Sequence, residues 1–208
     1  MRSLARFSSA SLPAPDRVLR PAIAFSLALT AQLRRSALPP EVGRYLNASD
    51  HTAALASRNP ANYILSAITR EAAAAFRSGS ISDILYSHLD ERLSTIANIQ
   101  VACERIATTP IPFTYTLLLH RTAYLFCCPL PIALAPTLGL ATPFFCTLVA
   151  YTFFGLDALG DELEDPFGDH ANTLPLDAMT RVIEINLLEA LGEPNLPPSL
   201  EPIDHELR

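Results

Sequence analysis

His120 and Arg121 are ionisable residues within an otherwise apolar stretch, which makes them the first candidates for chemistry. Ionisable side chains are costly in hydrocarbon and usually functional there, so we expect both to face an aqueous vestibule. In the alternative, both lie close enough to the cytoplasmic surface for their polar ends to reach it. A metal or haem role for His120 would need a second ligand at the same depth, and the apolar segments contain no other histidine.

Five carboxylates follow at helical spacing where the second apolar segment ends: Asp157, Asp161, Glu162, Glu164 and Asp165. The last four are called the acidic cluster here. Carboxylate oxygens suit hard cations, so the acidic cluster could contact a cation. It lacks the alternating Asp/Asn, Gly and Glu spacing of a calcium loop. A solvated helix end that pairs with arginines of a neighbouring chain is the alternative. We therefore assign no metal ligand.

Enzyme chemistry has no positive support in the sequence. There is no GxSxG, HExxH, phosphate-loop or dinucleotide-binding motif, so we expect no enzyme activity and no cofactor. The net charge of −6 supplies no basic face for phosphates, which argues against a nucleic-acid partner. The four cysteines have neither zinc-ligand nor disulfide-framework spacing.

The apolar stretch that holds His120 is long enough to cross a membrane twice. Residues 122–156 contain no charged side chain, and a crossing needs about 20 residues. We expect spans at 113–135 and 142–159. The residues expected to kink and turn the chain between them are Pro129, Pro131, Pro136 and Gly139. A buried hairpin in a soluble bundle is the alternative.

The charges predict how such a hairpin would be oriented. All fifteen basic residues are arginines and lie outside the turn between the spans, so the positive-inside rule places both chain ends in the cytoplasm. Pro110 and Pro112 prevent a regular helix before Phe113 and fix the angle at which the first span begins. Tyr115 is suited to the membrane interface.

Helices that flank the hairpin follow from apolar periodicity and stop signals. We expect a loose segment at 1–20, cytoplasmic helices within 21–108, the membrane hairpin at 113–160, and a C-terminal helix and tail at 161–208. Within these ranges, the predicted helices start at Pro21, on either side of Asn47, where Ser or Asp could cap the second, after Pro60, after Ser80 and near Asp177. Gly79 is the predicted stop of the helix after Pro60, and Asn172 and Asp177 are the predicted caps of the last helix. The helix after Ser80 carries an apolar stripe that includes Ile84, Leu89, Leu93 and Ile96. The fold class is therefore all-α, as an integral membrane protein.

Three motifs, in this order, resemble the bacterial bestrophin family: GSISDIL at 79–85, CERIATTPIPFTYTLLLHRTAYLFC at 103–127, and ELEDPFG at 162–168 followed by LPLD at 174–177. The resemblance extends from about residue 19 to the C-terminus. It implies a pentamer of helical subunits around an axial ion pore in the plasma (inner) membrane. Animal members conduct anions, and cation selectivity occurs in some bacterial ones.

The resemblance gives a role to one residue, Ile84, which matches the apolar residue that narrows the cytoplasmic end of the pore. An apolar ring there would restrict hydrated ions by constriction and dewetting. Core packing of Ile84 is the alternative. The calcium clasp of animal members has a longer acidic run than residues 169–173, and Thr173 stands where the bacterial pattern usually has Asp. This departure argues against calcium gating.

Family members begin with two further membrane helices, the second of which lines the neck of the pore, and no apolar run here replaces them. The expectation is a mis-started gene model, a genuine half-protein, or a subunit that needs a partner. The leading hypothesis is a chloride or anion channel subunit whose partners are inorganic ions, lipid and further copies of itself. The alternatives are a non-conducting membrane scaffold and a membrane-bound metal or haem enzyme built on His120 and the acidic cluster.

Overall fold

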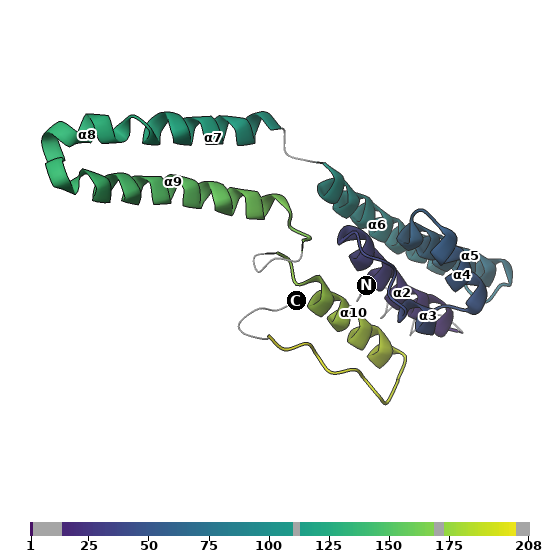
Figure 1. The fold of residues 1–208 in the computed structure, drawn as a ribbon. Helices are drawn as coiled ribbons and strands as arrows, with labels where there is room; N and C mark the ends of the chain where they lie inside the picture. Colours follow the sequence, from purple (N-terminus) through teal and green to yellow (C-terminus); the bar gives the residue numbers. More distant parts are fainter. Residues whose placement is uncertain (2–13, 110–112, 169–172, 203–208) are drawn as a thin grey trace. The chain divides into compact units, whose positions relative to one another are not determined.

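The computed structural model describes residues 1, 14–109, 113–168 and 173–202, and within these ranges every regular element is helical. The helices carry the labels of Figure 1. The chain divides into two compact units, Met1–Arg105 with Leu174–Arg208, and Ile106–Thr173. Each unit is described by itself. The predicted all-α fold class is confirmed for the described residues.

The first unit is a bundle in which one helix, α2 (Asp16–Leu33), packs against several others. The remaining helices of this unit are α3 (Val42–Tyr45), α4 (Ala48–Ala56), α5 (Pro60–Arg77), α6 (Asp83–Thr108, of which the last three residues belong to the second unit) and α10 (Leu176–Ala190). Helices α3, α5 and α10 all contact α2. The core of the unit therefore combines residues from the two ends of the chain, as Figure 1 shows for α2 and α10.

Helix α2 begins earlier than the sequence predicted. We expected residues 1–20 to be loose and Pro21 to open the helix, but the helix begins at Asp16 and contains Pro21 within it. Proline has no N–H to bond the carbonyl of Arg17 and ordinarily disfavours a helix interior. Val18 and Leu19 are both buried in the core, and the apolar surface that they remove from water offsets this cost.

Helix α5 ends where its sequence predicts. Gly79 follows the helix with a φ of 71°, in the left-handed region that side chains other than glycine rarely adopt. The N–H of Ser80 then bonds the carbonyl of Ala75 at 3.0 Å, which satisfies a carbonyl of the last turn. The predicted stop at Gly79 is confirmed.

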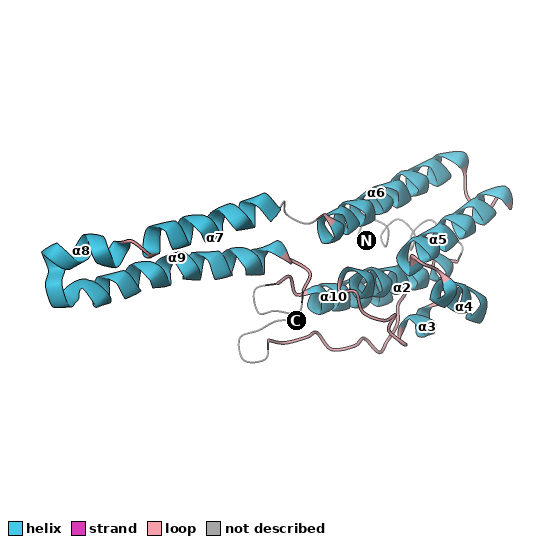
Figure 2. Ribbon diagram, turned by 45° about the horizontal axis from the view of Figure 1, so that its top comes forward, coloured by secondary structure: helices cyan, strands magenta, loops and turns pink. Residues whose placement is uncertain are grey.

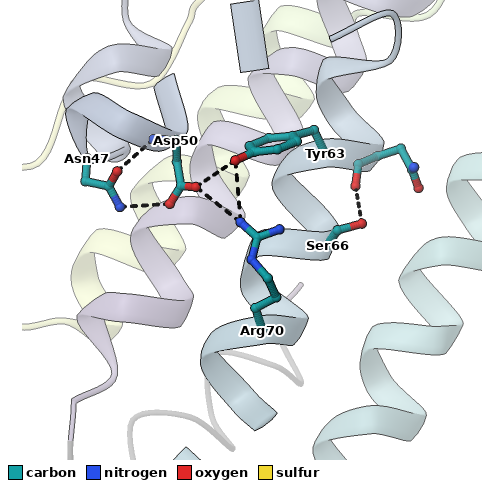
Figure 3. Close-up of polar contacts among 6 residues, drawn as sticks. Asn47, Asp50, Tyr63, Ser66 and Arg70 are labelled. Carbon is teal, nitrogen blue, oxygen red and sulfur yellow. Dashed lines mark hydrogen bonds and ion pairs between the residues drawn. The ribbon is translucent and has the colours of Figure 1, made fainter. Parts of the chain in front are cut away.

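A polar cluster joins the start of α4 to α5 (Figure 3). Asn47 caps α4 by accepting the N–H of Asp50 at 2.8 Å, although the sequence favoured Ser or Asp in this role. Asn47 also donates to the Asp50 carboxylate, which Tyr63 and Arg70 of α5 contact at 2.9 and 3.2 Å. Asp50 thereby acts across two helices rather than as a local cap.

An ion pair joins the start of α10 to the end of α2, and one of its residues was predicted to cap α10 instead. Asp177 was predicted to cap α10, but it lies in the first turn and pairs with Arg34, the C-cap residue of α2. Pro175 occupies the cap position and makes no side-chain hydrogen bond there. The other predicted cap, Asn172, lies outside the described residues. Tertiary pairing thus replaces the predicted capping.

Tyr45 of α3 donates a hydrogen bond to the carboxylate of Glu184 on α10 at 2.5 Å. Glu184 is buried and also pairs with Arg181 at 2.7 Å. Burial, followed by the hydrogen bond and the negative charge of Glu184, raises the pKa of Tyr45 to about 12. This contact ties α3 to the last described helix of the unit.

The substitution Tyr45→Phe is expected to reduce the loss of stability at alkaline pH. The folded chain keeps the Tyr45 proton up to a pKa of about 12. Unfolded tyrosine titrates near pH 10, so the contribution is complete below that pH and falls as the pH rises towards the folded value. The unfolding temperature between pH 8 and pH 11 measures the effect, with Tyr86→Phe as the control. Equal slopes for wild type and Tyr45→Phe would contradict the assignment.

The second unit is a helical hairpin, drawn in two views in Figures 1 and 2. One arm consists of α7 (Phe113–Cys127) and α8 (Leu130–Leu138), separated at Pro129. A short 3-10 turn, η1 (Gly139–Ala141), leads to the other arm, α9 (Thr142–Glu164). Gly139 has a φ of 50°, which suits the reversal. The turn and the start of the second arm agree with the predicted spans, although the first arm is two helices.

The hairpin leaves most of its apolar surface uncovered. The segment Phe113–Glu164 is long and apolar enough to cross a membrane by length and composition, and its most apolar window has a mean hydropathy of 1.8. Only 6% of that window is buried. A core helix of a soluble bundle would be mostly buried, so the soluble alternative is not favoured.

Candidate functional site

The two arms of the hairpin meet at a polar pair. His120 Nε2 of α7 lies 3.1 Å from Asp157 Oδ2 of α9, and their side chains are 41% and 13% exposed. A carboxylate in apolar surroundings needs a hydrogen-bond donor or a positive partner, and the imidazole provides one. The pair gives His120 a protein partner within the hairpin.

The sequence analysis grouped Asp157 with the carboxylates that follow the second span and did not pair it with His120. A partial signal was present, because His120 lies 19 residues before Gly139 and Asp157 lies 16 residues after Ala141, which agree to within one helical turn. Residues equally far from the turn of an antiparallel hairpin lie at the same level. Arg121, the neighbour of His120, has an exposed side chain. His120 and Arg121, which we expected to face the same aqueous vestibule, therefore differ in the exposure of their side chains.

Aromatic side chains also pack α7 against α9, nearer the turn than the His120–Asp157 pair. Tyr124 and Phe154 meet edge to face with ring centroids 5.4 Å apart, and Phe126 and Phe153 meet at 5.3 Å. Ala123 is buried between the helices. The small residue and the ring pairs bring α7 and α9 together beside the His120–Asp157 pair, which fixes its geometry by packing.

The residues predicted to shape the approach to the first span are described in part. Pro110 and Pro112 lie outside the described residues. Phe113 is the first residue of α7, as predicted, and Phe113 and Tyr115 are both exposed. Aromatic side chains at the end of a long apolar segment are typical of a membrane–water interface.

The acidic cluster lies at the end of α9 with exposed side chains. Asp161, Glu162 and Glu164 are in the helix, and Asp165 is its C-cap residue. Across the described part of the chain, no three His, Cys, Asp or Glu side chains are grouped so that they could hold a metal ion. Thr173 is described, whereas residues 169–172 are not. The described carboxylates thus form a negative helix end, which the helix dipole does not stabilise.

Ile84 lies apart from the core of the first unit. It is in the first turn of α6 and is 70% exposed, whereas the nearby Ile81 and Leu89 are 6% and 0% exposed. Ser82 accepts the N–H of Leu85 at 3.3 Å, which helps to start the helix at this position. The alternative that Ile84 packs in the core is wrong for the isolated chain. The Ile84 side chain is therefore exposed in the described structure.

Comparison with known proteins places this architecture in a family. The family model for Bacterial/Fungal Bestrophin protein matches residues 1–189. The voltage-dependent anion channel-forming protein mll4386 of Mesorhizobium japonicum is 47% identical over 98% of this chain and 66% of its own length. The voltage-dependent anion channel-forming protein YneE of Escherichia coli is 45% identical over 98% of this chain and 68% of its own. The chain thus spans about two thirds of these relatives' length.

A solved structure supports the same placement. A bacterial bestrophin homolog from Klebsiella pneumoniae is 43% identical and matches with a TM-score of 0.87, over 93% of this chain and 74% of that one. The described helices therefore share both sequence and fold with that structure, and the chain belongs to the bacterial and fungal bestrophin family.

Proposed function

We propose that this chain is a subunit of an anion channel through which ions move passively across a membrane. The observation that carries the proposal is the uncovered apolar hairpin in a chain that is 47% identical to a protein named as voltage-dependent and anion channel-forming. The hairpin lies in lipid, with both chain ends on the cytoplasmic side of the plasma (inner) membrane. The location of every arginine outside the turn supports this orientation.

Ile84 forms the narrow part of the pathway in this proposal. In a single chain, an exposed Ile84 buries little apolar surface. Copies of the chain arranged around an axis would place their Ile84 side chains in an apolar ring. Such a ring slows hydrated ions because it is narrow and because its apolar wall excludes water. The assembly is a homo-oligomer, which we propose to be a pentamer, and conduction needs no covalent step or cofactor.

The substitution Ile84→Ala is expected to raise single-channel chloride conductance severalfold, because removing three carbons widens an apolar constriction. Planar-bilayer recording of the purified chain measures it. Ile99→Ala is the matched control, since Ile99 is on the same helix and 56% exposed. Unchanged conductance in Ile84→Ala would exclude Ile84 from the constriction, and a correctly assembled but silent wild-type oligomer would overturn the channel proposal.

A further inference from the structure

Three helices of the first unit converge on one carboxylate near the end of α6. Glu104 Oε1 accepts hydrogen bonds from Gln100 Nε2 of α6 at 2.8 Å, from Gln32 Nε2 of α2 at 2.9 Å, and from Asn59 Nδ2 at 2.9 Å. Asn59 is the N-cap residue of α5. A single oxygen therefore links the end of α6 to two other helices.

The amides in this network depend on Glu104. Gln100 is only 3% exposed. Its Oε1 atom, like that of Gln32, is buried and makes no hydrogen bond within the described structure. The amide nitrogens of both residues therefore provide the polar contacts that offset their burial. Without the carboxylate, Gln32 Nε2 would lose its hydrogen bond, and Gln100 Nε2 would keep only the longer one to Asn59 Oδ1, at 3.4 Å. A buried donor that is left unsatisfied costs more than an ordinary lost hydrogen bond.

Asn59 couples the network to helix capping. Its Oδ1 atom accepts the N–H of Asn62 at 2.9 Å and so caps α5, while its Nδ2 atom donates to Glu104. The carboxylate accordingly sets which end of the amide faces the helix. Reversal of that amide would lose the cap and the bond to Glu104 together.

The network favours the ionised form of Glu104. Burial by itself raises the pKa of this carboxyl, but the hydrogen bonds from Gln100, Asn59 and Gln32 outweigh burial and lower its pKa below the ordinary value. The three hydrogen-bond donors described here, on α2, α5 and α6, are neutral amides, which do not titrate. The carboxylate is therefore ionised at neutral pH.

We propose that Glu104 is a positioning residue that holds the end of α6 against α2 and the first turn of α5. Glu104 lies nine residues before Phe113, the first residue of α7. The importance of this contact for conduction rests on the proposed channel function. The role of Glu104 in holding α6 does not depend on the channel function.

Hydrogen exchange of the purified 208-residue chain in detergent, read by mass spectrometry, tests the proposal. Glu104→Ala is expected to speed exchange about tenfold or more in peptides from 97–105 and 59–63, because three donors lose their acceptor. Peptides from α10 should exchange as in wild type. Asp90→Asn is the control, since it removes an exposed carboxylate from the same helix. Unchanged exchange in Glu104→Ala, or equal acceleration in α10, would overturn the proposal.

A pH profile separates positioning by charge from simple packing. Since the pKa of Glu104 is lowered in the folded chain, its contribution is present above the ordinary carboxyl value and is lost as the pH falls through the lower folded value. Wild type should lose protection at 97–105 in this acidic interval, whereas Glu104→Gln should lack the step. A step retained in Glu104→Gln would contradict the role. Chloride currents from the same samples test the channel proposal separately, because the exchange result does not depend on conduction.

Discussion

The substitution His120→Leu is expected to destabilise the hairpin by about 3 kcal/mol, because it leaves the Asp157 carboxylate in an apolar seam without its partner. Asp157 is only 13% exposed, so little solvent can replace the lost contact. The cost comes mainly from the stranded carboxylate rather than from the strength of the pair itself. Unfolding of the purified protein by a denaturing detergent, followed by circular dichroism, measures the change.

A double-mutant cycle identifies the source of that cost. His120→Leu with Asp157→Leu should be closer to wild type than His120→Leu alone, because replacing both partners by apolar groups leaves no buried charge. His88→Leu is the control for the change of side chain, since His88 is exposed on α6. Additive effects of the two hairpin substitutions would show that His120 and Asp157 do not interact.

Local rules in the sequence were sufficient for much of the fold. The uncharged run predicted the hairpin, and a glycine in the left-handed region marked the end of α5 at Gly79. Apolar spacing also predicted α6, because Leu89, Leu93 and Ile96 all lie in the core. Each of these features depends on residues close together in the sequence, which periodicity and stop signals describe well.

The features that the sequence did not predict depend on distant partners. Pro21 suggested a helix start, but burial of Val18 and Leu19 extends α2 in the N-terminal direction. Asp177 is of a residue type that often caps helices, yet it pairs with Arg34, which is far away along the chain. Intrinsic preferences are weak compared with such tertiary contacts.

The candidate site shows the same division between local and distant information. Periodicity placed Ile84 on the apolar stripe of α6, but it could not tell that the buried line passes through Leu89 and leaves the first turn exposed. Gln100 and Glu104 continue the three- and four-residue spacing of that line. Polar residues on a buried line are a signal of a hydrogen-bonded network, and this signal was missed.

The substitution Leu187→Ala is expected to destabilise the first unit by about 3 kcal/mol, within the range for a fully buried leucine. Leu187 is 0% exposed on α10 and belongs to the same core as Leu19 and Ile23 of α2. The lost side chain removes apolar burial and leaves a cavity between helices that are far apart in the sequence. Thermal unfolding measures the change, with Met179→Ala as the control at an exposed position of the same helix. Equal effects of the two substitutions would mean that α10 does not complete this core. A loss of stability that is much larger for Leu187→Ala than for Met179→Ala would show that the chain following the hairpin stabilises the helices that precede it.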